Sequence, residues 1–149
     1  MSVQLNQAAL WQNLRVVNQL QKEEIEILEK LIEVLPSSED EVIDEWLDRL
    51  ERHTKHRFTD EETRMIRSGY PFLSEHRREH TLAMDRIRKA RADWEEDRNV
   101  LTLWNFLERD YFDWFMQHLV DFDFSSENHE KRNRKPRNKV QPQLEVMDA

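Results

Sequence analysis

The sequence contains no cysteine. Disulfide bonds are therefore excluded, and so are metal sites built from thiolates, which leaves His, Asp and Glu as the candidate protein ligands for any metal ion. Glycine occurs once and proline four times in 149 residues, so signals for turns are scarce. A chain of this length can bury a hydrophobic core without covalent crosslinks. We expect one domain with few turns.

Long apolar runs are absent as well. No stretch approaches the roughly 18 apolar residues that are needed to cross a membrane. Residues 1–12 also lack the basic start and the apolar run of a signal peptide. These absences predict no membrane partner and, by default, a cytoplasmic location.

Positive charge is scarce except near the C-terminus. The formal net charge is −8, although the run KRNRKPRNK at Lys131–Lys139 carries six positive charges and leaves −14 on the rest of the chain. An acidic body is not expected to bind nucleic acid or anionic lipid. We predict that residues 125–149 form a basic, disordered tail. The alternative is that this tail contacts a protein or another anionic partner.

Four segments carry apolar residues at helical spacing. They run over about 19–35, from Ser38 to just before Gly69, from Pro71 through Ile87, and over about 100–122. Ser38 and Glu41 have the spacing of a capping box, which would start the second segment. Because the links are short, consecutive helices should be antiparallel. The prediction is an all-α, up-down-up-down four-helix bundle over residues 19–124, preceded by an N-terminal arm, residues 1–18, that Trp11 anchors.

Several ionisable residues share the apolar faces of these helices, where an isolated charge would be costly to bury. His76 and His80 are four residues apart, so both imidazoles project from one face. His118 continues the apolar stripe of the fourth segment, with Asp123 five residues later, and Glu61 is in phase with the stripe of the second. Taken singly, such histidines are more often structural. Together they form a ligand set that helical bundles use for iron, manganese or zinc.

At these residues the sequence resembles the hemerythrin family of oxygen-binding four-helix bundles, and its short bacterial members in particular. The resemblance extends over about residues 11–124 and rests on four groups of residues: Trp11 with Gln21–Glu24; Arg57–Glu62 with Met65, Tyr70 and Pro71; His76 with His80; and Trp114 with His118, Asp123 and Phe124. It implies a two-iron centre in which three histidines hold one iron, two hold the other, and a Glu and an Asp bridge them.

According to this resemblance, the ligands of the three-histidine iron are all present, whereas the second iron lacks both of its histidines. His76, His80 and His118 would hold one iron, with Glu61 and Asp123 as its carboxylates. The two histidines of the second iron are replaced by Ile25 and Arg57. Three nearby residues are alternative ligands that could rescue the second site, although their positions on the helices are less suitable: His53, His56 and Glu29.

Arg57 suggests a replacement for the second cation. Its guanidinium is always charged and fits a carboxylate in two-pronged fashion, so it could occupy the vacated space and pair with Glu61 or Asp123. Ile25 would fill the remaining space with hydrocarbon. In the opposite interpretation, the Arg57 head reaches outward into water and only its stem covers the core.

The leading hypothesis is a non-enzymatic, iron-binding protein that holds one ion and binds or senses a small diatomic ligand such as O2. Zinc or manganese are alternative ions. The resemblance places four apolar residues around the ligand: Phe58, Trp114, Phe115 and Leu119. Reversible oxygen carriage is not expected, because the family draws one electron from each of two irons. The rival hypothesis is a metal-free interaction or signalling module with Arg57 in place of the metal. Hydrolysis at a three-histidine zinc ion is a third reading, supported by its ligands alone.

Overall fold

The computed structural model describes residues 17–133, and the regular elements within this range are helices without strands. The first three long helices are α2 (Gln19–Val34), α3 (Asp40–Ser68) and α4 (Leu73–Asp97). The last helical stretch is continuous and consists of α5 (Val100–Asn105), η1 (Phe106–Tyr111), α6 (Phe112–His118), η2 (Leu119–Asp123) and a final helix over 124–133. The predicted all-α bundle is therefore confirmed.

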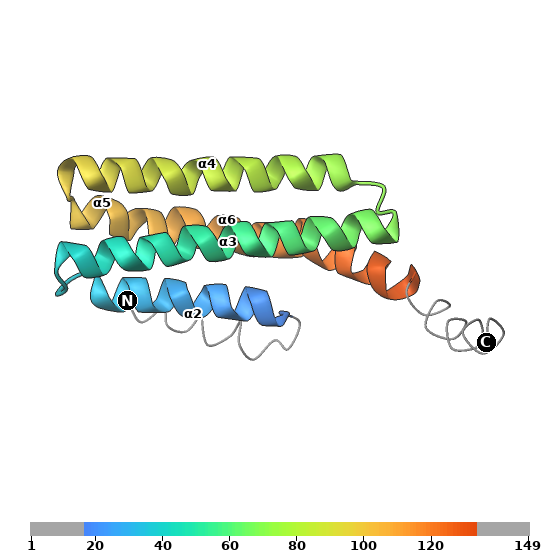
Figure 1. Cartoon of the computed structure of the whole chain (residues 1–149), viewed down its shortest axis with the longest axis horizontal. Coiled ribbons are helices and arrows are strands. Elements are labelled where there is room, and N and C mark those ends of the chain that lie inside the picture. Colours follow the sequence, from blue (N-terminus) through green and yellow to red (C-terminus); the bar gives the residue numbers. More distant parts are fainter. Residues whose placement is uncertain (1–16, 134–149) are drawn as a thin grey trace, which may run out of the picture.

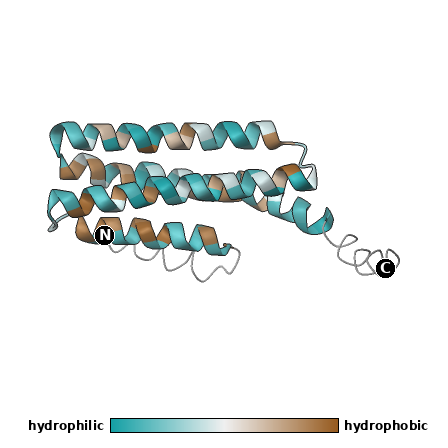
Figure 2. Ribbon diagram, viewed as in Figure 1, coloured by the Kyte–Doolittle hydropathy of each residue, from teal (hydrophilic) through white to brown (hydrophobic). Residues whose placement is uncertain are grey.

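The long helices lie side by side, and the chain reverses direction at each link between them (Figure 1). α2 packs against α3, α3 against α4, α4 against α5, and α2 against η1, so the helices enclose one core. Hydrophobic and hydrophilic residues alternate along each helix at helical spacing (Figure 2). The core consists of the buried members of these stripes: Ile25, Leu28, Leu31, Leu35, Ile43, Leu47, Leu50, Phe58, Ala83, Met84, Ile87, Trp94, Leu103, Leu107, Tyr111, Phe112, Phe115 and Leu119.

The start of α3 differs from the prediction. The helix begins at Asp40, and its N-cap residue, Glu39, makes no side-chain capping bond. The backbone N–H of Ser38 instead donates to the carbonyl oxygen of Val34 at 2.9 Å. Ser38 therefore belongs to the turn that closes α2 and cannot cap the next helix. At the other end of α3, Gly69 has a φ of 65° and accommodates the left-handed conformation that ends the helix, as predicted.

Two π-helical segments, η1 and η2, interrupt the last helix. These segments allow a run of buried residues spaced four apart to face the core: Leu103, Leu107, Tyr111, Phe115, Leu119 and Asp123. Four residues advance an α-helix by about 40° more than a full turn, so such a stripe would drift around the helix. The wider π turns take up the extra residues. They keep the whole stripe facing the core.

The C-terminal boundary also differs from the prediction, because residues 125–133 are helical rather than the start of a disordered tail. Tertiary contacts explain the difference. Tyr70 Oη donates to Ser125 Oγ at 2.9 Å, His129 Nε2 donates to the carbonyl oxygen of Ser68 at 2.8 Å, and Asn18 Nδ2 donates to Glu127 at 2.7 Å. The remainder of the basic tail, and the predicted arm up to residue 16 with Trp11, lie outside the described residues.

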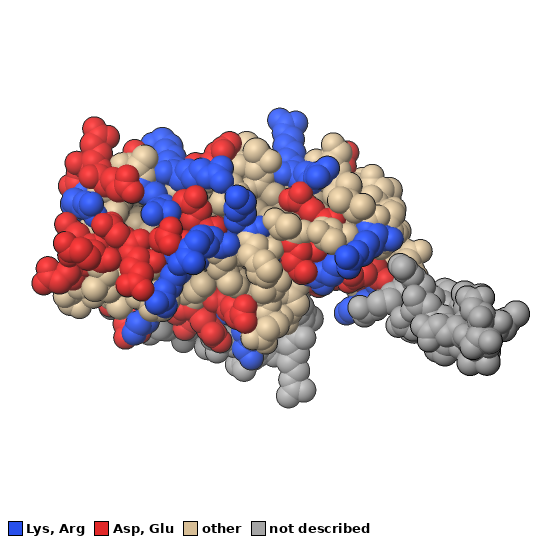
Figure 3. All heavy atoms as spheres, viewed as in Figure 1, with Lys and Arg blue, Asp and Glu red and all other residues tan. Residues whose placement is uncertain are grey.

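The surface is strongly charged. On the face drawn in Figure 3, acidic side chains gather at the end of the bundle where α3 begins and α4 ends, and basic ones are interspersed over the rest. Within residues 17–133, no helix is long and apolar enough to span a membrane.

Candidate metal centre

Five ionisable side chains meet inside the bundle, and they are the five that the sequence predicted as ligands. Glu61 comes from α3, His76 and His80 from α4, His118 from α6, and Asp123 from η2. One potential ligand atom from each residue lies within 4.8 Å of all the others. Each of these residues is at most 4 % exposed. The cluster is therefore a compact, buried set of nitrogen and oxygen donors.

The distances show that the donor atoms converge on one point. The Nε2 atoms of His76 and His118 are 3.0 Å apart, and each lies 3.0 Å from Asp123 Oδ1. His80 Nε2 lies 3.1 Å from Glu61 Oε1, and His76 Nε2 lies 3.6 Å from the same oxygen. Three imidazoles thus direct the same ring nitrogen inward. This donor set suits a divalent transition-metal ion such as iron, zinc or manganese.

Helical geometry brings these residues together. His76 and His80, one α-helical turn apart, project from the same face of α4. His118 and Asp123 are five residues apart, which in an α-helix would separate their directions by about 140°. They nevertheless meet, because η2 adds a π turn whose hydrogen bonds join residues five apart. The H-x-x-x-x-D spacing noticed in the sequence is thus a consequence of the π-helix.

The charges in the cluster are shared rather than isolated. Burial alone would lower the pKa of His76, but hydrogen bonds and the charges of Asp123 and Glu61 raise it to about 9. Burial lowers the pKa of His118, partly against the effect of Asp123. Burial would raise the pKa of Glu61, yet the charge of Arg57 and hydrogen bonds with the two histidines of α4 hold it well below its usual range. Without metal, the cluster therefore holds a proton on His76, which a cation would displace.

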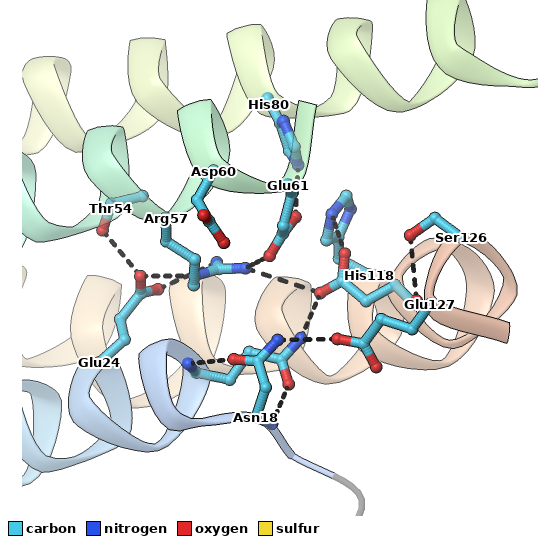
Figure 4. Close-up of polar contacts among 12 residues, drawn as sticks. Asn18, Glu24, Thr54, Arg57, Asp60, Glu61, His80, His118, Ser126 and Glu127 are labelled. Atoms are coloured by element: carbon cyan, nitrogen blue, oxygen red, sulfur yellow. Dashed lines mark hydrogen bonds and ion pairs between the residues drawn. The ribbon is translucent and has the colours of Figure 1, made fainter. Parts of the chain in front are cut away.

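Arg57 occupies the adjoining space (Figure 4), with its guanidinium between two helices. Its side chain is only 1 % exposed, so the interpretation in which its head reaches water is wrong. Nη1 donates to Glu61 Oε2 at 2.7 Å and lies 3.6 Å from Asp123 Oδ2. Nε donates to Glu24 Oε1 at 2.9 Å and Nη2 to Glu24 Oε2 at 3.3 Å. The guanidinium thus bridges the ligand cluster and a carboxylate of α2.

The sequence reasoning missed this role of Glu24. Glu24 is fully buried, and its carboxylate also accepts hydrogen bonds from Tyr111 Oη at 2.5 Å and Thr54 Oγ1 at 3.1 Å. Burial would raise the pKa of Glu24, but the charge of Arg57, hydrogen bonds from Arg57 and Tyr111, and the nearby ring of His53 lower it to about 2. One signal was available, because Glu24 directly precedes Ile25, one of the two positions where the family resemblance expects a histidine. A carboxylate buried at position 24 needs a positively charged or hydrogen-bonding partner.

Gln21 was also missed as a contributor to the site. It is fully buried on α2, and its Nε2 donates to Asp123 Oδ2 at 3.1 Å. Oδ1 of the same carboxylate faces the histidines, so its two oxygens are bound from opposite sides. Gln21 therefore orients Asp123 from α2, which contributes no residue to the cluster.

The other residues named in the sequence analysis are apolar residues, which lie in the core or beside the cluster, and three alternative ligands. Ile25 is fully buried in the core, and Phe115 and Leu119 are almost fully buried. Phe58 stacks on His80 with ring centroids 3.8 Å apart, and half-buried Trp114 stacks on His118 at 4.6 Å. These aromatic rings form apolar walls against two of the histidines.

The three alternative ligands lie outside the cluster of five. His56 is exposed, and Glu29 is half-buried on α2. His53 turns toward the acidic pair of α2, with Nε2 at 3.2 Å from Glu23 Oε1 and Nδ1 at 3.6 Å from Glu24 Oε1. The structure therefore does not bring these residues to the five converging donors.

Comparisons with known proteins agree with this geometry. A family model described as the hemerythrin HHE cation-binding domain matches residues 10–124, a range that contains all five residues of the cluster. Neither the curated proteins nor the solved structures gave a match.

Proposed function

Since this chain belongs to the hemerythrin HHE cation-binding domain family, we propose that it holds a single iron ion between His76, His80, His118, Glu61 and Asp123. The observation that carries the proposal is the convergence of five buried donor atoms within 4.8 Å, which come from α3, α4 and the last helix. Burying this many ionisable groups is costly unless they are paired or bind a metal. Three imidazoles and two carboxylates are suitable ligands for iron.

Arg57 and Ile25 support one ion rather than two. A guanidinium cannot lose its charge in a protein and cannot donate a lone pair to a metal. Arg57 is fully buried beside the cluster and its charge is already paired with Glu24 and Glu61. Ile25 supplies hydrocarbon and is likewise fully buried. A second cation would therefore meet a fixed positive charge and lack both of its own imidazoles.

The balance of buried charges also supports one metal ion rather than two. Three buried carboxylates, those of Glu24, Glu61 and Asp123, lie around the guanidinium of Arg57, which contributes a single positive charge. With neutral histidines, one divalent ion makes the buried group neutral overall. A second divalent ion would leave two uncompensated positive charges in the core, which is unfavourable in a medium of low polarity.

The function we propose for this centre is the binding or sensing of a small diatomic ligand. Iron(II), when bound, supplies a coordination position for a molecule such as O2 or nitric oxide. The rings of Phe58 and Trp114 stack against two of the histidines and shield that region from water. Two-electron oxygen carriage is not part of the proposal, because one iron supplies only one of the two electrons.

Metal analysis tests the proposal. Chelator-treated protein is loaded with Fe(II) without oxygen, freed of excess metal, and analysed for iron per chain. We expect one iron in the natural chain and none in His118→Ala, while His56→Ala, which removes an exposed histidine, retains one. An electron paramagnetic resonance signal on addition of nitric oxide would report the open position. Two irons per natural chain would contradict the single-site proposal.

The replacement of the second site can be tested by restoring it. In the double variant Ile25→His/Arg57→His, both missing imidazoles return and the fixed charge is removed. We expect iron to rise from one to two per chain. Ile25→His alone is the control and should stay at one, because Arg57 still occupies the space.

A metal-free interaction module is the second candidate, and one observation favours it. Arg57 already pairs with the carboxylates of Glu24 and Glu61, so part of the charge is balanced without metal. The basic residues Lys131–Lys139 would then be the contact for an anionic partner. A chain that takes up no Fe(II), Zn(II) or Mn(II), with an unchanged melting temperature, would support this candidate over the metal centre.

A further inference from the structure

The ring of His80 is contacted from its outer side by a carboxylate that is not part of the metal cluster. His80 Nδ1 lies 2.7 Å from Glu62 Oε2. Glu62 sits on α3 next to Glu61 but points to the opposite edge of the His80 ring. Its second oxygen, Oε1, accepts from Arg77 Nε at 3.0 Å. A carboxylate supported by an arginine thus stands behind one of the three imidazoles.

The other two imidazoles lack such support. The Nδ1 atoms of His76 and His118 are buried and have no hydrogen-bond partner among residues 17–133. All three Nε2 atoms converge on the same cluster, so the difference concerns only the outer edges of the rings. The three histidines are therefore inequivalent before any metal binds.

Contacts on three sides restrain the His80 ring. Phe58 stacks on its face, with centroids 3.8 Å apart and planes 7° from parallel. Glu62 lies at Nδ1, and Glu61 Oε1 lies 3.1 Å from Nε2. Glu62 accepts a proton from Nδ1, so a cation that replaces the contact of Nε2 with Glu61 finds the ring already oriented with Nε2 toward the cluster. The protein therefore sets the orientation of the His80 ring and the nitrogen that faces the cluster.

We infer that Glu62 is a positioning residue that makes His80 the preformed anchor of the metal site. This inference rests on the proposed function, because it concerns a ligand of that same centre. A carboxylate behind a metal-bound imidazole fixes its ring and increases its basicity, and removing such a partner typically weakens metal binding by about 10- to 100-fold. His76 and His118, without such partners, are oriented by their neighbours in the cluster and by the cation itself.

Glu51 provides a matched control within the same helix. Its side chain is 24 % exposed and that of Glu62 is 22 % exposed. Glu51 also pairs with arginines of α4, at 3.5 Å to Arg88 and 3.0 Å to Arg91. Glu62→Gln and Glu51→Gln therefore each remove a charged α3–α4 contact, but only the first touches a proposed ligand.

Affinities for Zn(II) and Co(II) are measured by competition with a chelating dye for the natural chain and for three variants. We expect Glu62→Gln to bind about 10-fold more weakly, because its amide still accepts a hydrogen bond but carries no charge. Glu62→Ala should be weaker still, whereas Glu51→Gln should stay within about twofold of the natural chain. If Glu62→Ala does not fold, the metal affinities of Glu62→Gln and Glu51→Gln are compared with each other, and equal affinities would contradict the inference.

NMR of the Zn(II)-bound protein provides a readout that a general loss of stability would not change. In the natural chain and in Glu51→Gln, the Nδ1 proton of His80 should be hydrogen-bonded to a carboxylate and should exchange slowly with water, whereas in Glu62→Ala it should exchange faster. Unchanged affinity and unchanged exchange of the Nδ1 proton in the Glu62 variants of a metal-binding chain would overturn the inference alone. A natural chain that binds neither metal would overturn the proposed function together with it.

Discussion

At the scale of single residues, the protein is unusual in burying an arginine beside a ligand cluster. Arg57 is buried, and its charge is matched by Glu24 and Glu61, with Asp123 nearby. Burying such a group carries a large desolvation cost, which the surrounding carboxylates offset. The same carboxylates would be destabilised if the guanidinium were removed.

Removal of this charge should strongly destabilise the metal-free protein. We expect Arg57→Met to lower the free energy of unfolding by about 3–5 kcal/mol, the usual result of leaving a buried charge unpaired. Arg49→Met is the control, because Arg49 makes the same i,i+4 contact with Glu45 on the surface, where the change should stay within about 0.5 kcal/mol. Urea unfolding of the metal-free forms measures both. Equal effects of the two substitutions would contradict the proposed balance of buried charges.

Glu24 should give the protein an acid-dependent stability. Its pKa is about 2 in the folded protein, against 4.5 for an unperturbed Glu. A carboxyl group with a lowered pKa stabilises the fold above about pH 4.5, and this contribution is lost as the pH falls toward 2. We therefore expect Glu24→Gln to be clearly less stable than the natural chain at pH 6 and the difference to shrink by pH 3. Unfolding curves at both pH values measure the difference in the free energy of unfolding. An equal difference at pH 6 and pH 3 would contradict the ionisation of Glu24.

At the scale of the helical elements, the last helix determines the geometry of the site. Its two π-helical segments keep a four-residue stripe on the core face and bring His118 to within 3.0 Å of Asp123. Its final turns, residues 124–133, contact the Gly69 turn and the start of α2. These turns therefore hold Asp123 from its C-terminal side.

Truncation tests the importance of these final turns. A chain ending at Phe124 loses the contacts of Ser125, Glu127 and His129, three hydrogen bonds worth about 1 kcal/mol each. We expect it to be about 2–3 kcal/mol less stable than a chain ending at Asn133, by denaturant unfolding. Equal stability of the two chains would indicate that the helix beyond Phe124 is not needed for folding.

At the scale of the whole molecule, the cluster links α3, α4 and the last helix at one buried point. α2 contributes no residue to the cluster and interacts with it through Gln21 and Glu24. A ligand that binds only the folded state stabilises that state in proportion to the logarithm of its concentration. Metal should therefore act as a link between helices.

Metal should raise the melting temperature of the natural chain. Zn(II) at about 100 times its dissociation constant would add about 2.7 kcal/mol to the free energy of unfolding. His118→Ala should show no such increase, because it lacks one of the three imidazoles of the cluster. Differential scanning calorimetry with and without a chelator measures the change. An equal increase in both proteins would indicate metal binding elsewhere.

The helical elements and the five residues of the cluster could be predicted from the amino-acid sequence. Helical periodicity is a local property, and His76 with His80, Glu61 and His118 could be read from it directly. The sequence also placed Ile25 and Arg57 at the two positions where the family resemblance expects further histidines. A resemblance to one family connected these separated residues, which periodicity alone could not do.

The direction of the Arg57 side chain and its ion-pair partners depend on contacts between helices. Its partner Glu24 lies 33 residues away on another helix, and no local pattern specifies that contact. The π-helical segments and the helical residues 125–133 were likewise decided by packing, since their local sequence is compatible with an ordinary α-helix or a polar tail. The physical reason is that burial and charge pairing depend on surfaces that exist only after the helices have come together.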